Sequence, residues 1–119
     1  MKNMPMSNAF SQVLLFQVKP DHLDAFETLM RQVQSEQEQL PGCRQARYMK
    51  RFYTFDDVTS GEPPRELTKI VKCVKYFGML TFDSPEDCGQ ATRWLFDCYG
   101  REITKMCLMP FDIHSGYEV

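Results

Sequence analysis

Tyrosine and arginine side chains on predicted strands, and a histidine that follows the last of these strands, are the residues of this sequence best suited to act on a small molecule. Tyrosine can orient a phenolic or quinone-like compound, arginine can hold an anion, and histidine can move a proton near neutral pH. The candidate catalytic residues are Tyr48, Tyr76 and His114, and the candidate substrate-binding residues are Arg47, Tyr53 and Trp94. Each also has a structural interpretation, which is packing in a core or an interface, or a surface hydrogen bond for His114.

Other kinds of site have no support in the sequence. The other histidine, His22, lies in the first turn of a predicted helix and is expected to be solvated. No serine lies in a nucleophile elbow, and the glycines form neither a P-loop nor a dinucleotide-binding pattern. The five cysteines are odd in number and none are at CxxC spacing, so we expect reduced thiols and neither a zinc site nor disulfides. No motif is specific enough to name a reaction.

The composition is that of an ordinary globular domain. The chain has 119 residues, 25% of them charged and 43% hydrophobic, with a formal net charge of -2. We therefore expect a single domain over residues 1–119 and no broad phosphate-binding surface. No apolar run approaches the roughly 18 residues that span a bilayer, and Met1–Ser7 lacks the features of a signal peptide. The expected location is cytoplasmic.

The first half of the chain predicts a strand, a helix and a second strand. Phe10–Val18 is rich in Val, Leu and Phe and predicts a strand. A helix of about 18 residues is expected to begin near Asp21, because apolar residues then follow 3,4 spacing until a Leu-Pro-Gly stop at residues 40–42. Cys43–Phe55 predicts an edge strand with mixed faces. The acidic residues 56–66 predict a hairpin-type connection of unusual length.

The second half predicts a strand, a helix and a last strand. Leu67–Phe82 predicts a strand in which Gly78 is a candidate break. Ser84, followed by proline and two acidic residues, predicts a helix start with Ser84 as the N-cap. Gly100 is expected to interrupt this helix before its final turns. Cys107–Ile113 predicts a last strand, which its proline confines to an edge.

The resulting β-α-β-β-α-β order predicts a ferredoxin-like α+β fold. Right-handed crossovers place both helices on one face of a four-stranded antiparallel sheet, with the first and third strands central. Both central strands nevertheless carry apolar side chains on both faces, for example Leu14 and Phe16 on one face of the first strand and Val13 and Leu15 on the other, and the helices can cover only one face of the sheet. An apolar face of this extent indicates a partner or a ligand. We therefore expect a homodimer formed through the open sheet face.

Three segments of the chain form a further pattern: VKPDHLDAFETLM (18–30) with its following LPGC, an aromatic strand, and FDSPEDCGQATRWL (82–95). Together they resemble the antibiotic-biosynthesis monooxygenase-like family of dimeric α/β-barrel proteins. The resemblance implies a homodimer with a small-molecule pocket between sheet and helices in each protomer. Some members are cofactor-free oxygenases in which the substrate anion itself reduces O₂. Others degrade haem with a histidine on the second helix, and residues 85–106 contain none, so we expect no cofactor.

A different function remains open for the same element order. The segment KYFGMLTF (75–82) resembles the signature strand of RNA-recognition motifs, with Lys75, Phe77, Gly78 and Phe82 matching. Tyr76, however, replaces a residue that is small for steric reasons, and the whole chain is acidic. The leading expectation is thus a homodimer that binds an aromatic or quinol-type metabolite, either as a cofactor-independent monooxygenase or without turnover. A purely structural dimerisation module and an RNA binder are the alternatives.

Overall fold

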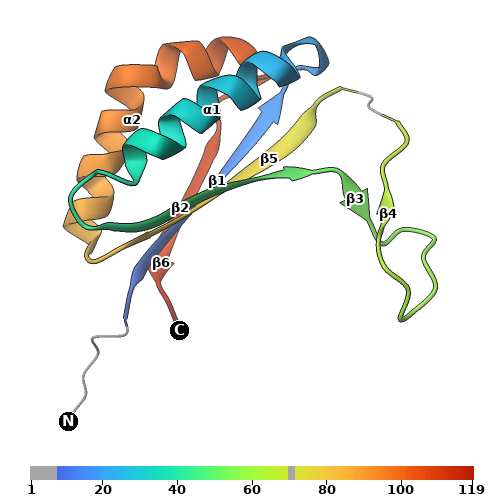
Figure 1. The fold of residues 1–119 in the computed structure, drawn as a ribbon, viewed down its shortest axis with the longest axis horizontal. Coiled ribbons are helices and arrows are strands. Elements are labelled where there is room, and N and C mark those ends of the chain that lie inside the picture. Colours follow the sequence, from blue (N-terminus) through green and yellow to red (C-terminus); the bar gives the residue numbers. More distant parts are fainter. Residues whose placement is uncertain (1–7, 70–71) are drawn as a thin grey trace.

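A four-stranded antiparallel sheet with two helices on one face forms the body of the protein. The computed structural model describes residues 8–69 and 72–119. The elements are β1 (Phe10–Val18), a 3₁₀ turn (Pro20–His22), α1 (Leu23–Gln37), β2 (Cys43–Arg51), β3 (Tyr53–Thr54), β4 (Arg65–Glu66), β5 (Val74–Phe82), α2 (Pro85–Met106) and β6 (Asp112–Tyr117). The sheet order is β2-β5-β1-β6, so β1 and β5 are central (Figure 1). The predicted ferredoxin-like α+β fold is confirmed.

The predicted breaks at glycines are wrong. β5 is continuous through Gly78, and α2 is continuous through Gly100, which is buried. A glycine in a helix costs only about 1 kcal/mol relative to alanine, and the packing of a long helix on the sheet outweighs that cost.

Two strand boundaries also differ from the prediction. The third main strand begins at Val74 rather than Leu67, and residues 70–71 of the predicted strand lie outside the described residues. The last strand is Asp112–Tyr117, whereas Cys107 makes only an isolated bridge to Val18. Pro110 therefore precedes the edge strand instead of lying within it, because a proline cannot donate to the ladder.

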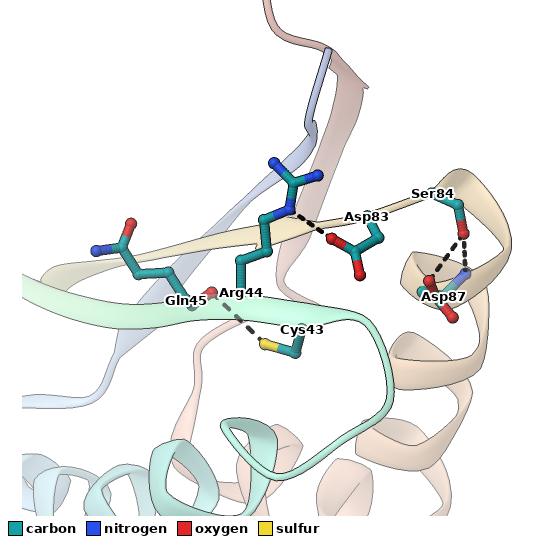
Figure 2. Close-up of polar contacts among 6 residues, drawn as sticks. All are labelled: Cys43, Arg44, Gln45, Asp83, Ser84 and Asp87. Carbon is teal, nitrogen blue, oxygen red and sulfur yellow. Dashed lines mark hydrogen bonds and ion pairs between the residues drawn. The ribbon is translucent and has the colours of Figure 1, made fainter. Parts of the chain in front are cut away.

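The start of α2 and the turn before β2 are tied together at one end of the sheet. Ser84 is the N-cap of α2, as predicted, and its Oγ accepts a hydrogen bond of 3.1 Å from the Asp87 backbone N–H. Figure 2 shows this cap beside the ion pair of Arg44 with Asp83, which joins β2 to the end of β5. Gly42 adopts a φ of +74°, and an added Cβ would lie 2.1 Å from an Asp87 oxygen. The turn after α1 therefore requires glycine for two reasons.

The core lies between the helices and the even-numbered side chains of β1 and β5. Its fully buried members include Leu14, Phe16, Phe26, Val33, Phe82, Leu95 and Ile103. These side chains come from alternate positions of the strands and from one stripe of each helix, as the hydrophobic periodicity predicts.

The opposite face of the sheet carries a second apolar cluster, which we call the open-face strip. It consists of Val13, Leu15, Met49, Phe77 and Met79. The strand register places Leu15 and Met49 on either side of Phe77, and Val13 beside Met79. Val13 is 38% exposed and Met49 47% exposed, so this face lacks the cover that the helices give the other face. The predicted second apolar face is thus present.

A hairpin arm extends from the sheet between β2 and β5. β3 pairs with β4 in a ribbon separate from the main sheet, and the arm projects away from the body (Figure 1). Leu67 closes its base by donating a backbone hydrogen bond of 2.8 Å to Phe52. The long hairpin-type connection predicted from the sequence is therefore present, and its two short strands pair with each other.

Candidate functional site

A pocket of about 270 Å³ lies between α1 and the helix-facing side of β2 and β5. We call it the α1 pocket. Alternation along the strands directs Tyr48 and Lys50 of β2 and Tyr76 of β5 to this side of the sheet. Among the described residues, the lining consists of Phe26, Glu27, Met30, Arg31, Gln34, Tyr48, Lys50 and Tyr76. The pocket thus combines an apolar floor with phenolic, cationic and carboxylate groups, a composition typical of small-molecule sites.

Within this lining, the Glu27 carboxylate interacts with three other side chains, those of Tyr76, Lys50 and Arg31. The Tyr76 hydroxyl donates a hydrogen bond to the Glu27 carboxylate. Lys50 Nζ lies 3.3 Å from Glu27 Oε2, and an Arg31 nitrogen lies 3.8 Å from Oε1. The hydrogen bond from Tyr76, followed by Lys50 and Arg31, lowers the pKa of Glu27 below its usual value of 4.5. Glu27 is therefore an anion at neutral pH.

Tyr76 and Tyr48 are both held as neutral hydrogen-bond donors. Burial, with the hydrogen bond to Glu27, raises the pKa of Tyr76 above its usual 10.0. Burial likewise raises the pKa of Tyr48, whose hydroxyl donates to Gln37 Oε1 at 2.8 Å. Gln37 is itself 1% exposed and is the one polar residue on the apolar stripe of α1. Neither tyrosine can therefore act as a base near neutral pH.

Gly78 sets the position of Tyr48. Gly78 lies between Leu14 and Tyr48 in the strand register, and the Tyr48 ring covers it. A Cβ added at Gly78 would lie 2.6 Å from Tyr48 Cε1 and 3.3 Å from Leu14 Cβ. The glycine that resembles a strand break is required because an aromatic ring packs directly on its backbone.

Substitution of Gly78 by alanine is expected to lower the free energy of unfolding by about 1–3 kcal/mol, the usual cost of overpacking. The added methyl group must displace the Tyr48 ring, so the hydrogen bond to Gln37 is lost as well. Urea denaturation measures the first effect, and tyrosine ultraviolet difference spectra measure the second. The matched control is Gly89→Ala, since a Cβ at that exposed helical position meets no atom within 4 Å. An unchanged midpoint in Gly78→Ala would contradict this role.

The other four predicted site residues lie outside the α1 pocket. Arg47 on β2 and His114 on β6 lie on the open face of the sheet. Arg47 is beside Met79 of the open-face strip, and His114 is beside Val13. Tyr53 is 55% exposed on the hairpin arm. Trp94 of α2 packs edge-on against Tyr99, with ring centroids 5.6 Å apart. The structure therefore brings Tyr48 and Tyr76 together and separates them from the rest.

The charged half of the pocket was not singled out from the sequence. Glu27 and Arg31 are four residues apart on α1, a spacing that indicates only a surface ion pair. Lys50 lies two residues after Tyr48 and therefore on the same face of the predicted strand. That alternation is the sequence feature that could have placed Lys50 in the same site as Tyr48. In residues 8–69 and 72–119, no three His, Cys, Asp or Glu side chains are grouped so that they could hold a metal ion. In the same ranges, no helix has the length and apolarity of a membrane span.

The pKa shifts in the pocket predict how stability depends on pH. Because the folded pKa of Glu27 is lowered, its contribution is complete above pH 4.5 and is lost as the pH falls through the folded value. The raised pKa of Tyr48 and of Tyr76 gives the opposite sign: their contribution is complete below pH 10 and is lost at higher pH.

Glu27→Gln is therefore expected to lower the free energy of unfolding at pH 7 by about 1 kcal/mol. The difference from the unmodified protein should shrink as the pH falls below 4.5 and through the lower folded pKa of Glu27, because the ionised carboxylate is then lost from the folded chain as well. Chemical denaturation at pH 3 and pH 7 measures the loss of free energy of unfolding at each pH. Glu102→Gln on α2 is the control. An equal difference at both pH values would contradict the assigned charge state.

No protein-family model and no curated protein matches the chain. Solved structures do match it along nearly its whole length. One is Rv0793 from Mycobacterium tuberculosis, with 10% identity, a TM-score of 0.68, and 93% of this chain and 95% of that chain covered. Another is an antibiotic biosynthesis monooxygenase, with 12% identity, a TM-score of 0.66, and coverage of 92% and 98%.

A third match is a mutant form of SnoaB, described as a cofactor-independent oxygenase from Streptomyces nogalater. It has 12% identity and a TM-score of 0.60, and the match covers 94% of this chain and 92% of that one. At these sequence identities the likeness shows a shared fold and does not transfer an activity. The chain therefore has the ferredoxin-like fold of the antibiotic-biosynthesis monooxygenase-like proteins that its sequence resembles.

Proposed function

We propose that the protein is a homodimer whose α1 pocket binds a small aromatic or quinol-type metabolite as its anion, and that it oxidises this compound with O₂ without a cofactor. The observation that carries the proposal is the triad of Tyr76, Glu27 and Lys50 in a pocket with an apolar floor. Phe26 and Met30 supply that floor. An aromatic body packs on such a floor, while its oxygen reaches the polar groups.

The charge balance of the pocket favours an anionic ligand. Lys50 and Arg31 supply two positive charges against the single carboxylate of Glu27. A phenolate or enolate oxygen placed beside Lys50 restores neutrality. The Tyr48 ring lines the same pocket. The pocket then selects the ionised form of its ligand, so no strong base is needed to prepare it.

An aromatic anion held in this way can react directly with O₂. It passes one electron to O₂, and the resulting superoxide and substrate radical combine into a peroxide at carbon. Protonation and loss of water then convert a CH₂ group into a carbonyl, so that R₂CH₂ and O₂ give R₂C=O and H₂O. The description of SnoaB as a cofactor-independent oxygenase supports this chemistry for the fold. The protein's own contribution is to bind, orient and ionise the substrate.

Self-association follows from the open-face strip. Five apolar side chains are gathered there, and a second copy of the same strip is a complementary surface in a two-fold dimer. Face-to-face packing of two sheets buries both strips at once. Arg47 and His114, at the same face, then lie at the rim of that interface.

The second candidate function is binding without turnover. It is favoured by the state of Glu27, whose carboxylate already interacts with Tyr76, Lys50 and Arg31 and has a lowered pKa. A general base works best with a pKa near the operating pH, and Glu27 is far from that condition. A metabolite could therefore be stored or sensed here rather than converted.

One experiment separates the two functions. The protein is incubated under ¹⁸O₂ with naphthols, naphthohydroquinones and anthrones, while O₂ consumption and product mass are followed. Consumption above the protein-free rate, with one ¹⁸O in the product, supports the oxygenase. Saturable binding by calorimetry without consumption supports the binding protein. Neither binding nor consumption across the panel would contradict the proposal as a whole.

A further inference from the structure

A second pocket, of about 280 Å³, lies where β2 leaves the sheet and β5 enters it. We call it the basic pocket. It is lined by Arg51, Phe52, Leu67, Lys69, Lys72, Cys73, Val74 and Lys75. It shares no lining residue with the α1 pocket.

Positive charge is concentrated in this pocket. Arg51, Lys69, Lys72 and Lys75 all line it, and none of its lining residues in the described part of the chain is acidic. Among the described residues, none of these four forms an ion pair, whereas six ion pairs occur elsewhere. This concentration occurs in a chain whose net charge is -2.

The strand register places two of these positive charges opposite each other, so they repel when no ligand is bound. Arg51 and Lys75 are directly opposite each other on β2 and β5. Like charges at directly opposed positions destabilise a sheet. An acidic residue at one of the two positions would make the fold more stable and would keep the surface polar. An anion between the two side chains removes the repulsion and adds charge-assisted hydrogen bonds.

The remaining lining is apolar. Phe52, Leu67 and Cys73 are half-buried, and Val74 is buried. Inorganic anions gain nothing from such a wall, but a compact aromatic or aliphatic group does. The ligand therefore needs a multiply charged head for the cations and an apolar body for the wall.

We infer that the basic pocket binds a small phosphate monoester with an aromatic or aliphatic body. A phosphate monoester carries about 1.5 to 2 negative charges at pH 7 and offers three acceptor oxygens, which suits several cations better than one carboxylate does. Arginine and lysine are the side chains that recognise phosphate most often. This site neighbours the α1 pocket, since Lys50 Nζ lies 5.0 Å from the centroid of the Phe52 ring, but its proposed ligand does not depend on the oxygenase chemistry.

The test uses phenyl phosphate, inorganic phosphate and phenol as probes of the full chain. Two-dimensional ¹⁵N NMR follows the amides of Cys73, Val74 and Lys75 during each titration. Phenyl phosphate is expected to bind at least about tenfold more tightly than inorganic phosphate, and phenol is expected not to shift these amides. The double variant K72Q/K75Q should weaken phenyl phosphate by about tenfold or more.

A charge-matched control, R101Q/K105Q on α2, changes the net charge equally and should leave the affinity unchanged. Equal losses in the two double variants would mean that phosphate responds to net charge alone, which overturns the assignment. Equal affinities for phenyl phosphate and inorganic phosphate would overturn the part played by the apolar wall. Tighter binding of a uridine octanucleotide, with shifts spreading to Phe77 and Met79, would instead identify a single-stranded RNA surface and also overturn it.

Discussion

Replacement of Phe77 by glutamate is expected to convert the proposed dimer into a monomer at micromolar concentration. Phe77 lies at the centre of the open-face strip, between Leu15 and Met49. In a two-fold dimer the substitution buries two carboxylates and brings them near each other. Burial of an unpaired charge costs several kcal/mol, so the dissociation constant should rise by about 100-fold or more.

Sedimentation velocity between 1 and 100 µM measures the change. Met49→Glu provides a second variant at a position already 47% exposed, where a charge is tolerated by the single chain. Ala25→Glu, on the exposed side of α1, adds the same charge away from the strip and should leave the dimer intact. An unmodified protein that sediments as a monomer at 100 µM, or an unchanged dimer in both strip variants, would contradict this assembly.

Replacement of Lys50 by methionine is expected to weaken binding of an acidic naphthol by about 10- to 100-fold, the usual effect of losing one hydrogen bond to a charged group. Methionine keeps most of the apolar stem but removes the charge that faces Glu27 at 3.3 Å. The remaining Glu27 carboxylate then repels the ligand anion. Any O₂ consumption should fall with the same variant, because the reactive form of the substrate is no longer held.

The distinguishing measurement compares ionised and neutral ligands. Calorimetric titrations with 1-naphthol at pH 8 to 10 should show the loss, whereas titrations with 1-methoxynaphthalene, which cannot ionise, should be nearly unaffected. Lys105→Met, at an exposed position on α2, is the control and should behave as the unmodified protein. Equal weakening of both ligands by Lys50→Met would show that Lys50 supports the pocket shape rather than the ligand charge.

The sheet and its two helices could be predicted from local patterns because those patterns are strong. β1 was predicted with its observed bounds, since nine mostly apolar residues end at a Lys-Pro boundary. The N-cap at Ser84 was also correct, since serine, proline and two acids each satisfy the first turn for a separate reason. The uncovered apolar face followed from strand alternation alone.

The errors arise where tertiary contacts override local preference. Gly78 resembles a strand break, but it is needed because it has no side chain, which leaves room for the Tyr48 ring that lies on it. Gly100 resembles a helix break, but burial against the sheet keeps α2 intact. The last strand began later than predicted because its ladder with β1 fixes the pairing at Asp112, and no local signal marks that register.

The α1 pocket could be predicted only in part. Tyr48 and Tyr76 were identified as strand tyrosines, but Glu27 lies on α1, 49 residues from its partner Tyr76. Such a contact depends on how the helix crosses the sheet, and sequence spacing carries no information about it. Arg47 and His114 were grouped with the tyrosines because their residue types suit catalysis. The alternation of side chains along their strands places both on the open face of the sheet instead.

A crystal structure of the protein grown with 1-naphthol at pH 9 tests the central claim most directly. We expect the naphthol ring against Phe26 and Met30, with its oxygen within hydrogen-bonding distance of Lys50, in every protomer. Naphthol found only between the open sheet faces, or an α1 pocket filled by its own side chains, would contradict a ligand site organised by Tyr76, Glu27 and Lys50.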